Sequence, residues 1–229
     1  MSNPLSIESV QSEIDLIEAR RLHGPAVNMI KSGVCALIID AHSSDVFYAR
    51  HHAKEGYYPN DSIGTSSETF RWVPHRANNQ GRQTETALEA FLRSLHEELG
   101  LDREGFMKAG FHFNWANPVL SRAMIDASTS TDGSESLDAL SFAVMVDNPE
   151  ALIFSSRTSE EILSTGFAPI EEIDTLEPFR PGFKQWFNSA HTALLRKTVD
   201  VNAPQYLEWI EPRTYQGTEV DVSLGHHEF

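Results

Sequence analysis

Cysteine and long apolar runs are scarce in this sequence of 229 residues. The single cysteine, Cys35, excludes an internal disulfide, and its place in a strand-like run suits a small buried hydrophobe better than a nucleophile. The longest apolar run, residues 34–39, is far too short to span a bilayer. The polar and acidic start does not resemble a signal peptide. These absences predict a cytoplasmic protein with no membrane partner.

Positive charge is the other shortage, with 18 Lys and Arg residues against 33 Asp and Glu residues. The formal net charge of −15 argues against extended nucleic acid as a partner, because binding a phosphate backbone needs a basic face. It does not exclude a small phosphorylated ligand. Divalent cations can bring such a ligand to an acidic site by neutralising the charge on both sides.

Apolar material is sufficient for one core, with 40% hydrophobic residues and 10% aromatic residues. Helical periodicity is expected at 5–20, 84–101 and 180–197, and Pro169 is expected to start a short helix. Strand patterns are expected at 33–50 around a polar turn, 68–74, 109–115, 140–146 and 161–168. Residues 117–128 fit either a helix or a strand, so both remain open. This mixture predicts an α+β or α/β sandwich.

The segment TETALEAFLRSLHEELGL, residues 84–101, has the clearest pattern. One side of the predicted helix is apolar and must face the core: Leu88, Phe91, Leu92, Leu95 and Leu99. Arg93 precedes Glu97 by four residues, which lets the guanidinium hold the carboxylate, and Gly100 is a natural helix end. Glu97 and Glu98 oppose the helix dipole at a cost of a few tenths to ~1 kcal/mol each. A divalent cation would offset that cost, although exposed helices also carry such pairs for solubility.

The spacing resembles the box of the Nudix hydrolase family. That box runs glycine, five residues, glutamate, seven residues, then Arg-Glu-(aliphatic)-x-Glu-Glu-x-Gly-(aliphatic). Over residues 79–101 the chain agrees with it at Glu85, Arg93, Leu95, Glu97, Glu98, Gly100 and Leu101. Two positions depart: Ser94 replaces the glutamate of the Arg-Glu pair, and Asn79 replaces the first glycine. Gly81 lies displaced in the loop before the helix.

The resemblance implies an α+β fold, an α/β/α sandwich with a mixed sheet packed between helices, over residues 30–197. Residues 1–29 then form an N-terminal helical extension and residues 198–229 a C-terminal tail. These appended segments could pair subunits into a homodimer.

The implied activity is Mg²⁺- or Mn²⁺-dependent hydrolysis of a nucleoside diphosphate linked to another moiety. Glu97 and Glu98 are the expected metal ligands, with Arg93 as their orienter and Glu85 as a supporting acid. The family often takes its general base from a later loop, where Glu161 or Glu160 is expected and Glu150 is a weaker candidate.

The two departures keep a second function open. Ser94 and the altered glycine loop remove groups that contact metal and phosphate in the family. The alternative is therefore a catalytically impaired module that binds a nucleotide-like ligand or a protein partner. His75 and His96 are further candidates for metal ligands, with a satisfied or solvated histidine as the alternative at each position.

Overall fold

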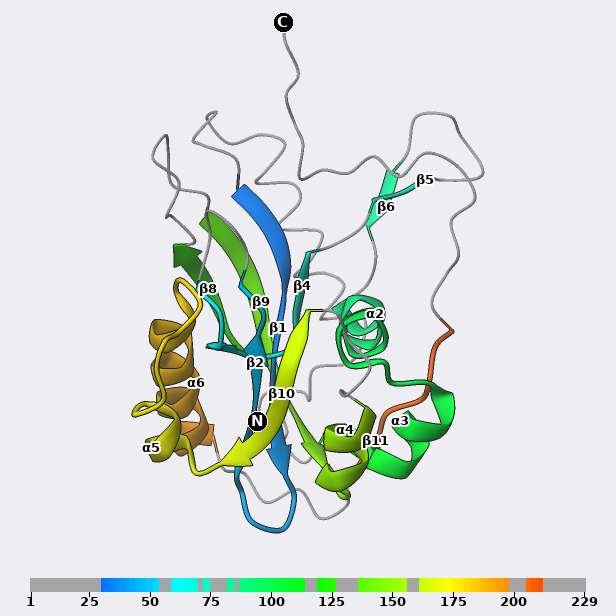
Figure 1. Ribbon diagram of the computed structural model, residues 1–229. Coiled ribbons are helices and arrows are strands. Elements are labelled where there is room, and N and C mark those ends of the chain that lie inside the picture. The colour runs from blue at the N-terminus through cyan, green and yellow to red at the C-terminus, as the bar shows by residue number, and fades with distance from the viewer. Residues whose placement is uncertain are drawn as a thin grey trace, which may run out of the picture.

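The structure is a computed structural model that describes residues 30–53, 59–69, 72–74, 82–84, 87–113, 119–126, 136–155, 161–197 and 205–211. Several sequence predictions fall outside these residues, namely the helix at 5–20, the helical extension 1–29, His75, Asn79, Gly81, Glu85 and Glu160. The described part is a mixed sheet with helices on both faces (Figure 1). This is the predicted α/β/α sandwich.

The main sheet has the strand order β10-β2-β1-β9-β7-β11. These strands are β1 (Ile30–Asp40), β2 (Val46–His51), β7 (Phe111–Phe113), β9 (Ser136–Val146), β10 (Ile162–Ala168) and β11 (Gln205–Tyr206). β1 and β9 run parallel along their whole length, and the other pairs are antiparallel. Three more strands pair beside this path: β3 (Ser62–Gly64) with β2, β4 (Ser67–Thr69) with β1, and β8 (Val119–Asp126) with β9. A separate hairpin joins β5 (Trp72–Pro74) and β6 (Arg82–Thr84).

Helices cover both faces of the sheet, so strand β1 needs apolar side chains on both of its faces. Val34, Ala36 and Ile38 face one core cluster, and the intervening residues face the other: Cys35, Leu37 and Ile39. Cys35 is fully buried, and this burial raises the pKa of its thiol to about 12. The prediction that it acts as a buried hydrophobe is confirmed.

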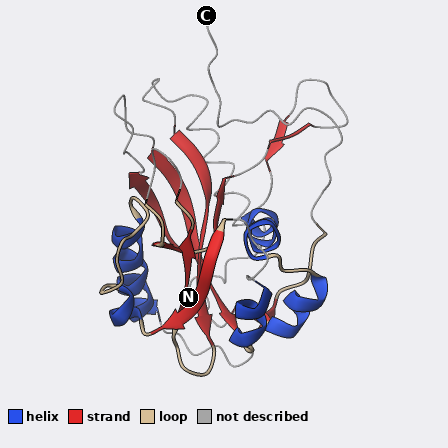
Figure 2. Cartoon of the chain, in the orientation of Figure 1, coloured by secondary structure: helices blue, strands red, loops and turns tan. Residues whose placement is uncertain are grey.

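Helices α2 (Ala87–Leu99), α3 (Arg103–Ala109) and α4 (Pro149–Ser155) cover one face, and α5 (Ile170–Ile173) and α6 (Phe183–Lys197) cover the other (Figure 2). The predicted apolar stripe of α6 is buried at Phe183, Trp186, Phe187 and Ala190, while the side chain of Leu194 lies outside the described residues. The indole of Trp186 donates a hydrogen bond to Ser141 Oγ at 2.7 Å and so joins α6 to β9.

Residues 117–128, for which the sequence allowed a helix or a strand, contain strand β8. Its antiparallel partner is β9, from Val119↔Phe142 to Asp126↔Ser136. Pairing with a neighbouring strand therefore decided between two local preferences that the sequence left equal.

The predicted tail is described only at residues 205–211. There β11 pairs with β7, and Leu207, Trp209 and Ile210 pack against the core cluster that contains α2. This part of the C-terminal region is thus attached to the sandwich. None of the described helices has the length and apolar character needed to cross a membrane.

Candidate functional site

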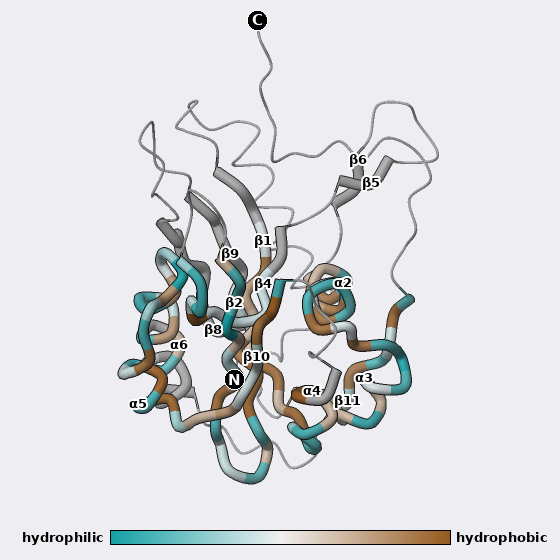
Figure 3. The backbone as a smooth tube through the Cα atoms, viewed as in Figure 1, coloured by the Kyte–Doolittle hydropathy of each residue, from teal (hydrophilic) through white to brown (hydrophobic). Residues whose placement is uncertain are grey.

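Helix α2 carries most of the box. Its apolar side is buried as predicted, with Leu88 partly exposed and the other positions inside: Phe91, Leu92, Leu95 and Leu99. Both hydrophobic and hydrophilic residues occur around its turns (Figure 3). The helix ends at Gly100, where φ is +64°, and the amide of Leu101 donates to the carbonyl of Leu95 at 3.1 Å. A glycine in this left-handed conformation ends a helix without steric cost.

The acid pair lies in the last turn of α2, and a buried arginine holds one of its members. Arg93 Nη1 donates to Glu97 Oε2 at 3.2 Å, and the Glu97 side chain is 39% exposed. Glu98 is half-buried, with its Oε2 atom inside the protein. The predicted Arg93–Glu97 contact is confirmed. It fixes one carboxylate at the surface end of the helix, while the next residue directs an oxygen inward.

Ser94, the residue that departs from the box, is fully buried. Its hydroxyl donates to the carbonyl of Phe91 at 2.9 Å and makes a second hydrogen bond with the hydroxyl of Ser66. Ser66 lies next to β4, so the two serines join α2 to the sheet. The sequence shows the substitution but not that the side chain is enclosed between helix and sheet.

Beside this contact the sheet has a split, where β1 and β2 are no longer paired with each other. β1 and β2 pair only at their hairpin end, at Ile39↔Val46. Further along, residues 62–69 fill the space between them, because β3 pairs with β2 and β4 pairs with β1. Thr65 Oγ1 donates to the carbonyl of Ala36 at 2.9 Å at the step from one partner to the other.

A buried histidine and an arginine meet in this split. The segment before α6 runs beside β3, where the amide of Arg180 donates to the carbonyl of Ile63 at 2.9 Å. Arg180 Nη1 lies 3.5 Å from Nε2 of His51 at the end of β2. Burial, and then the charge of Arg180, lower the pKa of His51 to about 3. Sequence reasoning missed this pair, because its members are 129 residues apart and neither belongs to a recognisable motif.

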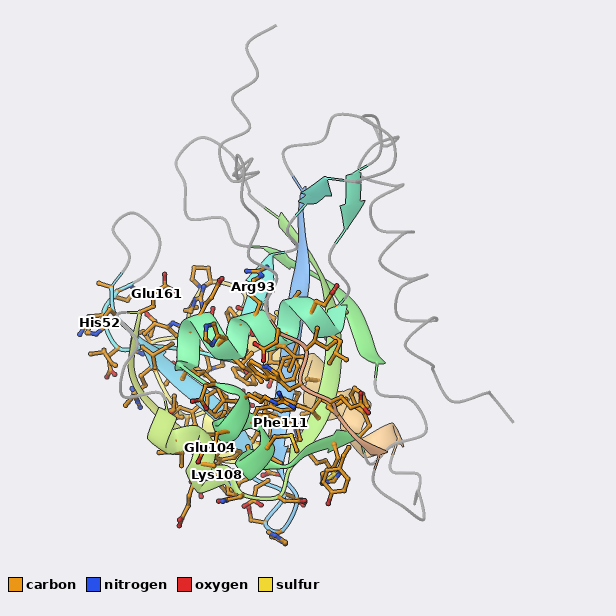
Figure 4. The ribbon with its side chains drawn as sticks, turned by 90° about the vertical axis from the view of Figure 1, so that its right-hand side faces the viewer. His52, Arg93, Glu104, Lys108, Phe111 and Glu161 are labelled. Carbon is orange, nitrogen blue, oxygen red and sulfur yellow. The ribbon has the colours of Figure 1, made fainter. Side chains whose placement is uncertain are left out.

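Two of the three candidates for the general base, Glu161 and Glu150, are described, and both lie on the surface. Glu161 is exposed immediately before β10, and its carbonyl accepts a hydrogen bond from the amide of His52 at 3.0 Å. His52, Glu161 and Arg93 are labelled in Figure 4, where the first two lie close together. Glu150, the weaker candidate, is exposed on α4. The role of Glu161 stays a prediction.

Residues 87–113 and the other described segments contain no group of three or more His, Cys, Asp or Glu side chains that could hold a metal ion. Glu85 is outside these segments. His96 Nδ1 lies 3.0 Å from the carbonyl of Leu101, so this histidine is engaged with the end of its own helix.

The C-terminal segment 205–211 contributes to a second polar cluster, formed by His112, Asp147 and Tyr206. His112 Nε2 lies 3.0 Å from Asp147 Oδ1, and the Tyr206 hydroxyl donates to Asp147 Oδ2 at 2.8 Å. The Trp209 ring lies 5.4 Å from the ring of Phe106 and 6.4 Å from that of His96. The segment therefore contacts α2 one residue before the acid pair.

Comparisons with known proteins give matches among solved structures alone. No family model matches the chain, and no curated protein matches it. The crystal structure of UDP-X diphosphatase is 13% identical, with a TM-score of 0.43, over 80% of this chain and 71% of that one. The NUDIX domain of Shewanella oneidensis NrtR, complexed with ADP ribose, is 12% identical, with a TM-score of 0.45, over 77% and 98%.

A NUDIX hydrolase from Nitrosomonas europaea is 13% identical, with a TM-score of 0.44, over 72% of this chain and 90% of that one. All three identities are low and all three TM-scores lie below 0.5. The sequence resemblance consequently depends on the seven box positions. By that motif the chain resembles the Nudix family, and its fold is the helix-covered mixed sheet that the resemblance implies.

Proposed function

We propose that this protein hydrolyses a nucleoside diphosphate linked to another moiety, with Mg²⁺ or Mn²⁺ bound beside Glu97 and Glu98. The observation that carries the proposal is the last turn of α2. It holds two acids where the helix dipole disfavours them, and a buried arginine is committed to one of them. A buried guanidinium is costly unless it is paired, and its use here to orient a carboxylate supports a binding role.

The donor set fits a metal ion that is shared with substrate. Mg²⁺ keeps several waters and is commonly bound by one or two carboxylates together with phosphate oxygens. Glu97, partly exposed, and Glu98, with one oxygen inside, offer such a partial set. When bound, the ion neutralises the diphosphate oxygens and activates a water.

The chain's own residues then have separate roles in the proposal. Arg93 holds the Glu97 carboxylate in one orientation, which lowers the entropy lost on binding. Glu161, immediately before β10, accepts a proton from the attacking water, and Glu85 supports the acid pair.

A second function is favoured by Ser94. Its hydroxyl is enclosed against Ser66, so this position offers no carboxylate and little space for one. A domain with that reduced set could bind a nucleotide-like ligand or a protein partner without hydrolysing the ligand.

Turnover distinguishes the two functions. The full chain is assayed with Mg²⁺ or Mn²⁺ against nucleoside diphosphates joined to sugars, alcohols or second nucleosides. Glu98→Gln is expected to reduce turnover by about 100-fold or more, since changes in the outer shell of metal sites already cost 10–100-fold. Glu89→Gln, which removes the same charge from the first turn of α2, should retain activity within about twofold.

The hydrolase and the binding module predict different outcomes. Equal turnover of parent and Glu98→Gln would contradict the metal role of Glu98. Absence of turnover by the parent, together with an increase in its melting temperature when a nucleotide is added, would replace the hydrolase with the binding module.

A further inference from the structure

The C-terminal segment 205–211 is attached to the sandwich by few contacts. Its strand β11 is two residues long and, among the described strands, pairs with β7 alone. The amide of Leu207 then donates to the carbonyl of Phe111 at 2.9 Å. Beyond this bond the segment contributes apolar side chains to the cluster that contains α2, including Trp209. So short a paired strand supplies little stability by itself, and the attachment depends on these side chains and on one polar anchor.

Asp147 is the polar anchor, and the sandwich holds it in place. It directly follows β9, and its amide donates to the carbonyl of Gly110 at 3.4 Å. The amide of Asn148 donates to the carbonyl of Ala109, the last residue of α3, at 3.0 Å. Gly110 has a φ of +68°, and a Cβ at this glycine would lie 3.1 Å from Asp147 Oδ2. The glycine at the end of α3 therefore leaves room for the carboxylate.

The Asp147 carboxylate joins the sheet to the segment. Its Oδ1 lies 3.0 Å from Nε2 of His112 on β7, and its Oδ2 accepts a hydrogen bond from the Tyr206 hydroxyl at 2.8 Å. An ionised carboxylate only accepts hydrogen bonds, so Nε2 of His112 carries the proton. The bond to Asp147 raises the pKa of the Tyr206 hydroxyl, which therefore remains a donor at physiological pH. One side chain of the sandwich thus fastens the segment.

This attachment is exposed, and it buries a polar atom without a partner. Tyr206 is 55% exposed and the Asp147 side chain is 40% exposed, so water competes for their hydrogen bond. Nε1 of Trp209 is buried, and within the described ranges it has no hydrogen-bond acceptor. Docking the segment therefore takes this nitrogen out of water without compensation, and undocking returns it to water. Both features lower the free energy needed to detach the segment.

The segment lies against the end of the box helix. It runs from β11 past α3 (Figure 1). The Trp209 ring lies 5.4 Å from the ring of Phe106 on α3 and 6.4 Å from the ring of His96 on α2. None of these contacts involves the parallel pair β1 and β9 at the centre of the sheet. They can therefore break as one local unit while the centre stays folded.

We infer that residues 205–211 form a strap that opens and closes on the end of the box helix as one unit, with Asp147 as its latch. In the closed strap the Tyr206 hydroxyl is bonded to Asp147, and Trp209 lies beside His96. In the open strap β11 has left β7 while the sandwich keeps its fold. Opening removes a packing partner of α2 directly before the acid pair. The strap has this behaviour whether the domain hydrolyses its ligand or only binds it.

Native-state hydrogen exchange of the full chain, followed for single amides by NMR, tests the strap. The Leu207 amide reports on the strap, and the Ala36 amide, bonded to the carbonyl of Ser66 in the middle of β1, reports on the sandwich. The protection factor of Leu207 should be at least about 100-fold lower than that of Ala36. Low urea concentrations should hardly change it, because opening the strap exposes little surface. Equal protection of the two amides would overturn the inference.

Trp186→Phe separates the strap from the sandwich. It removes the indole bond to Ser141 on the opposite face of the sheet and should speed exchange of Ala36 by about 10-fold or more. Leu207 should stay within about twofold, because opening the strap leaves α6 in place. Equal acceleration of both amides would show that the segment detaches only when the whole protein unfolds, and this result also overturns the inference.

Two variants test the latch. Asp147→Ala and Tyr206→Phe lose the same charge-assisted hydrogen bond, so each should speed exchange of Leu207 by about 5- to 10-fold. Glu104→Ala is the matched control, since it removes the same charge from an exposed pair with Lys108 on α3, and it should leave Leu207 within about twofold.

Circular dichroism establishes which latch variants are folded. If Asp147→Ala does not fold, Tyr206→Phe decides the question. Exchange of Leu207 that is as slow in a folded latch variant as in the parent overturns the role of Asp147. Faster exchange in both variants and unchanged exchange in the control support the strap and its latch.

Discussion

The last turn of α2 and the C-terminal segment 205–211 touch each other through His96 and Trp209, yet they are held in different ways. The helix turn is held by short-range contacts, such as the Arg93–Glu97 pair and the hydrogen bonds that close the helix at Gly100. The segment is held by strand pairing with β7 and by packing on a core assembled from distant parts of the chain.

This difference separates two contributions to one site. The helix turn supplies charge whose placement follows from helical geometry. The segment supplies apolar area, since Trp209 packs beside Phe106 and His96. Local helical geometry therefore places the acids, and strand pairing places the apolar segment next to their helix. Three substitutions test this difference between the helix turn and the segment.

The largest effect is expected from Ser94→Glu, which restores the box sequence. The new carboxylate would replace a fully buried hydroxyl beside Ser66 and should lower the free energy of unfolding by about 3 kcal/mol or more. Urea unfolding measures this change. Burial raises the pKa of the introduced carboxyl, so the loss should shrink as the pH falls toward 5 and the group is protonated.

Ser94→Ala is the control for that substitution and should cost about 1 kcal/mol, the net value of a hydrogen bond. A Ser94→Glu protein as stable as the parent, with a higher affinity for Mg²⁺, would show that this position opens toward the metal site.

Trp209→Ala should have the second-largest effect. The half-buried indole packs on α3 and the end of α2, and its loss should reduce the free energy of unfolding by about 2–3 kcal/mol. Trp209→Phe should retain most of the stability, because the buried Nε1 finds no acceptor among the described residues. Chemical denaturation of both variants gives the comparison, and equal losses would argue against packing as the cause.

The smallest effect is expected from Tyr206→Phe. The hydrogen bond to Asp147 raises the pKa of the Tyr206 hydroxyl above its ordinary value of 10.0. A folded-state pKa above the unfolded value means that the contribution is complete below pH 10 and is lost as the pH rises through the raised pKa. The melting temperature of the parent should therefore lie slightly above that of Tyr206→Phe at about pH 8, and the difference should shrink as the pH rises above the ordinary tyrosine value. A difference that does not change with pH would contradict this assignment.

Features that depend on short spacing were predictable. The apolar side of α2, its end at Gly100 and the Arg93–Glu97 contact follow from 3.6 residues per turn. The buried stripe of α6 and the start of α5 after Pro169 follow in the same way. The acids of the box could be named as ligand candidates because their spacing alone puts them on one flank of a helix.

Features that depend on distant partners were not predictable. Residues 117–128 became a strand because β9 was available as a partner. The enclosure of Ser94 required Ser66, which is 28 residues away, and the meeting of His51 with Arg180 spans 129 residues. No local pattern marks either contact.

By itself the sequence determined a helix with an acid pair at its end, since backbone geometry converts a spacing of three or four residues into adjacency. The tertiary structure alone decided what lies next to that helix: a sheet against which Ser94 is enclosed and a C-terminal segment packed on its end. Those neighbours come from separate strands and loops, and only the pairing and burial of the whole chain bring them together.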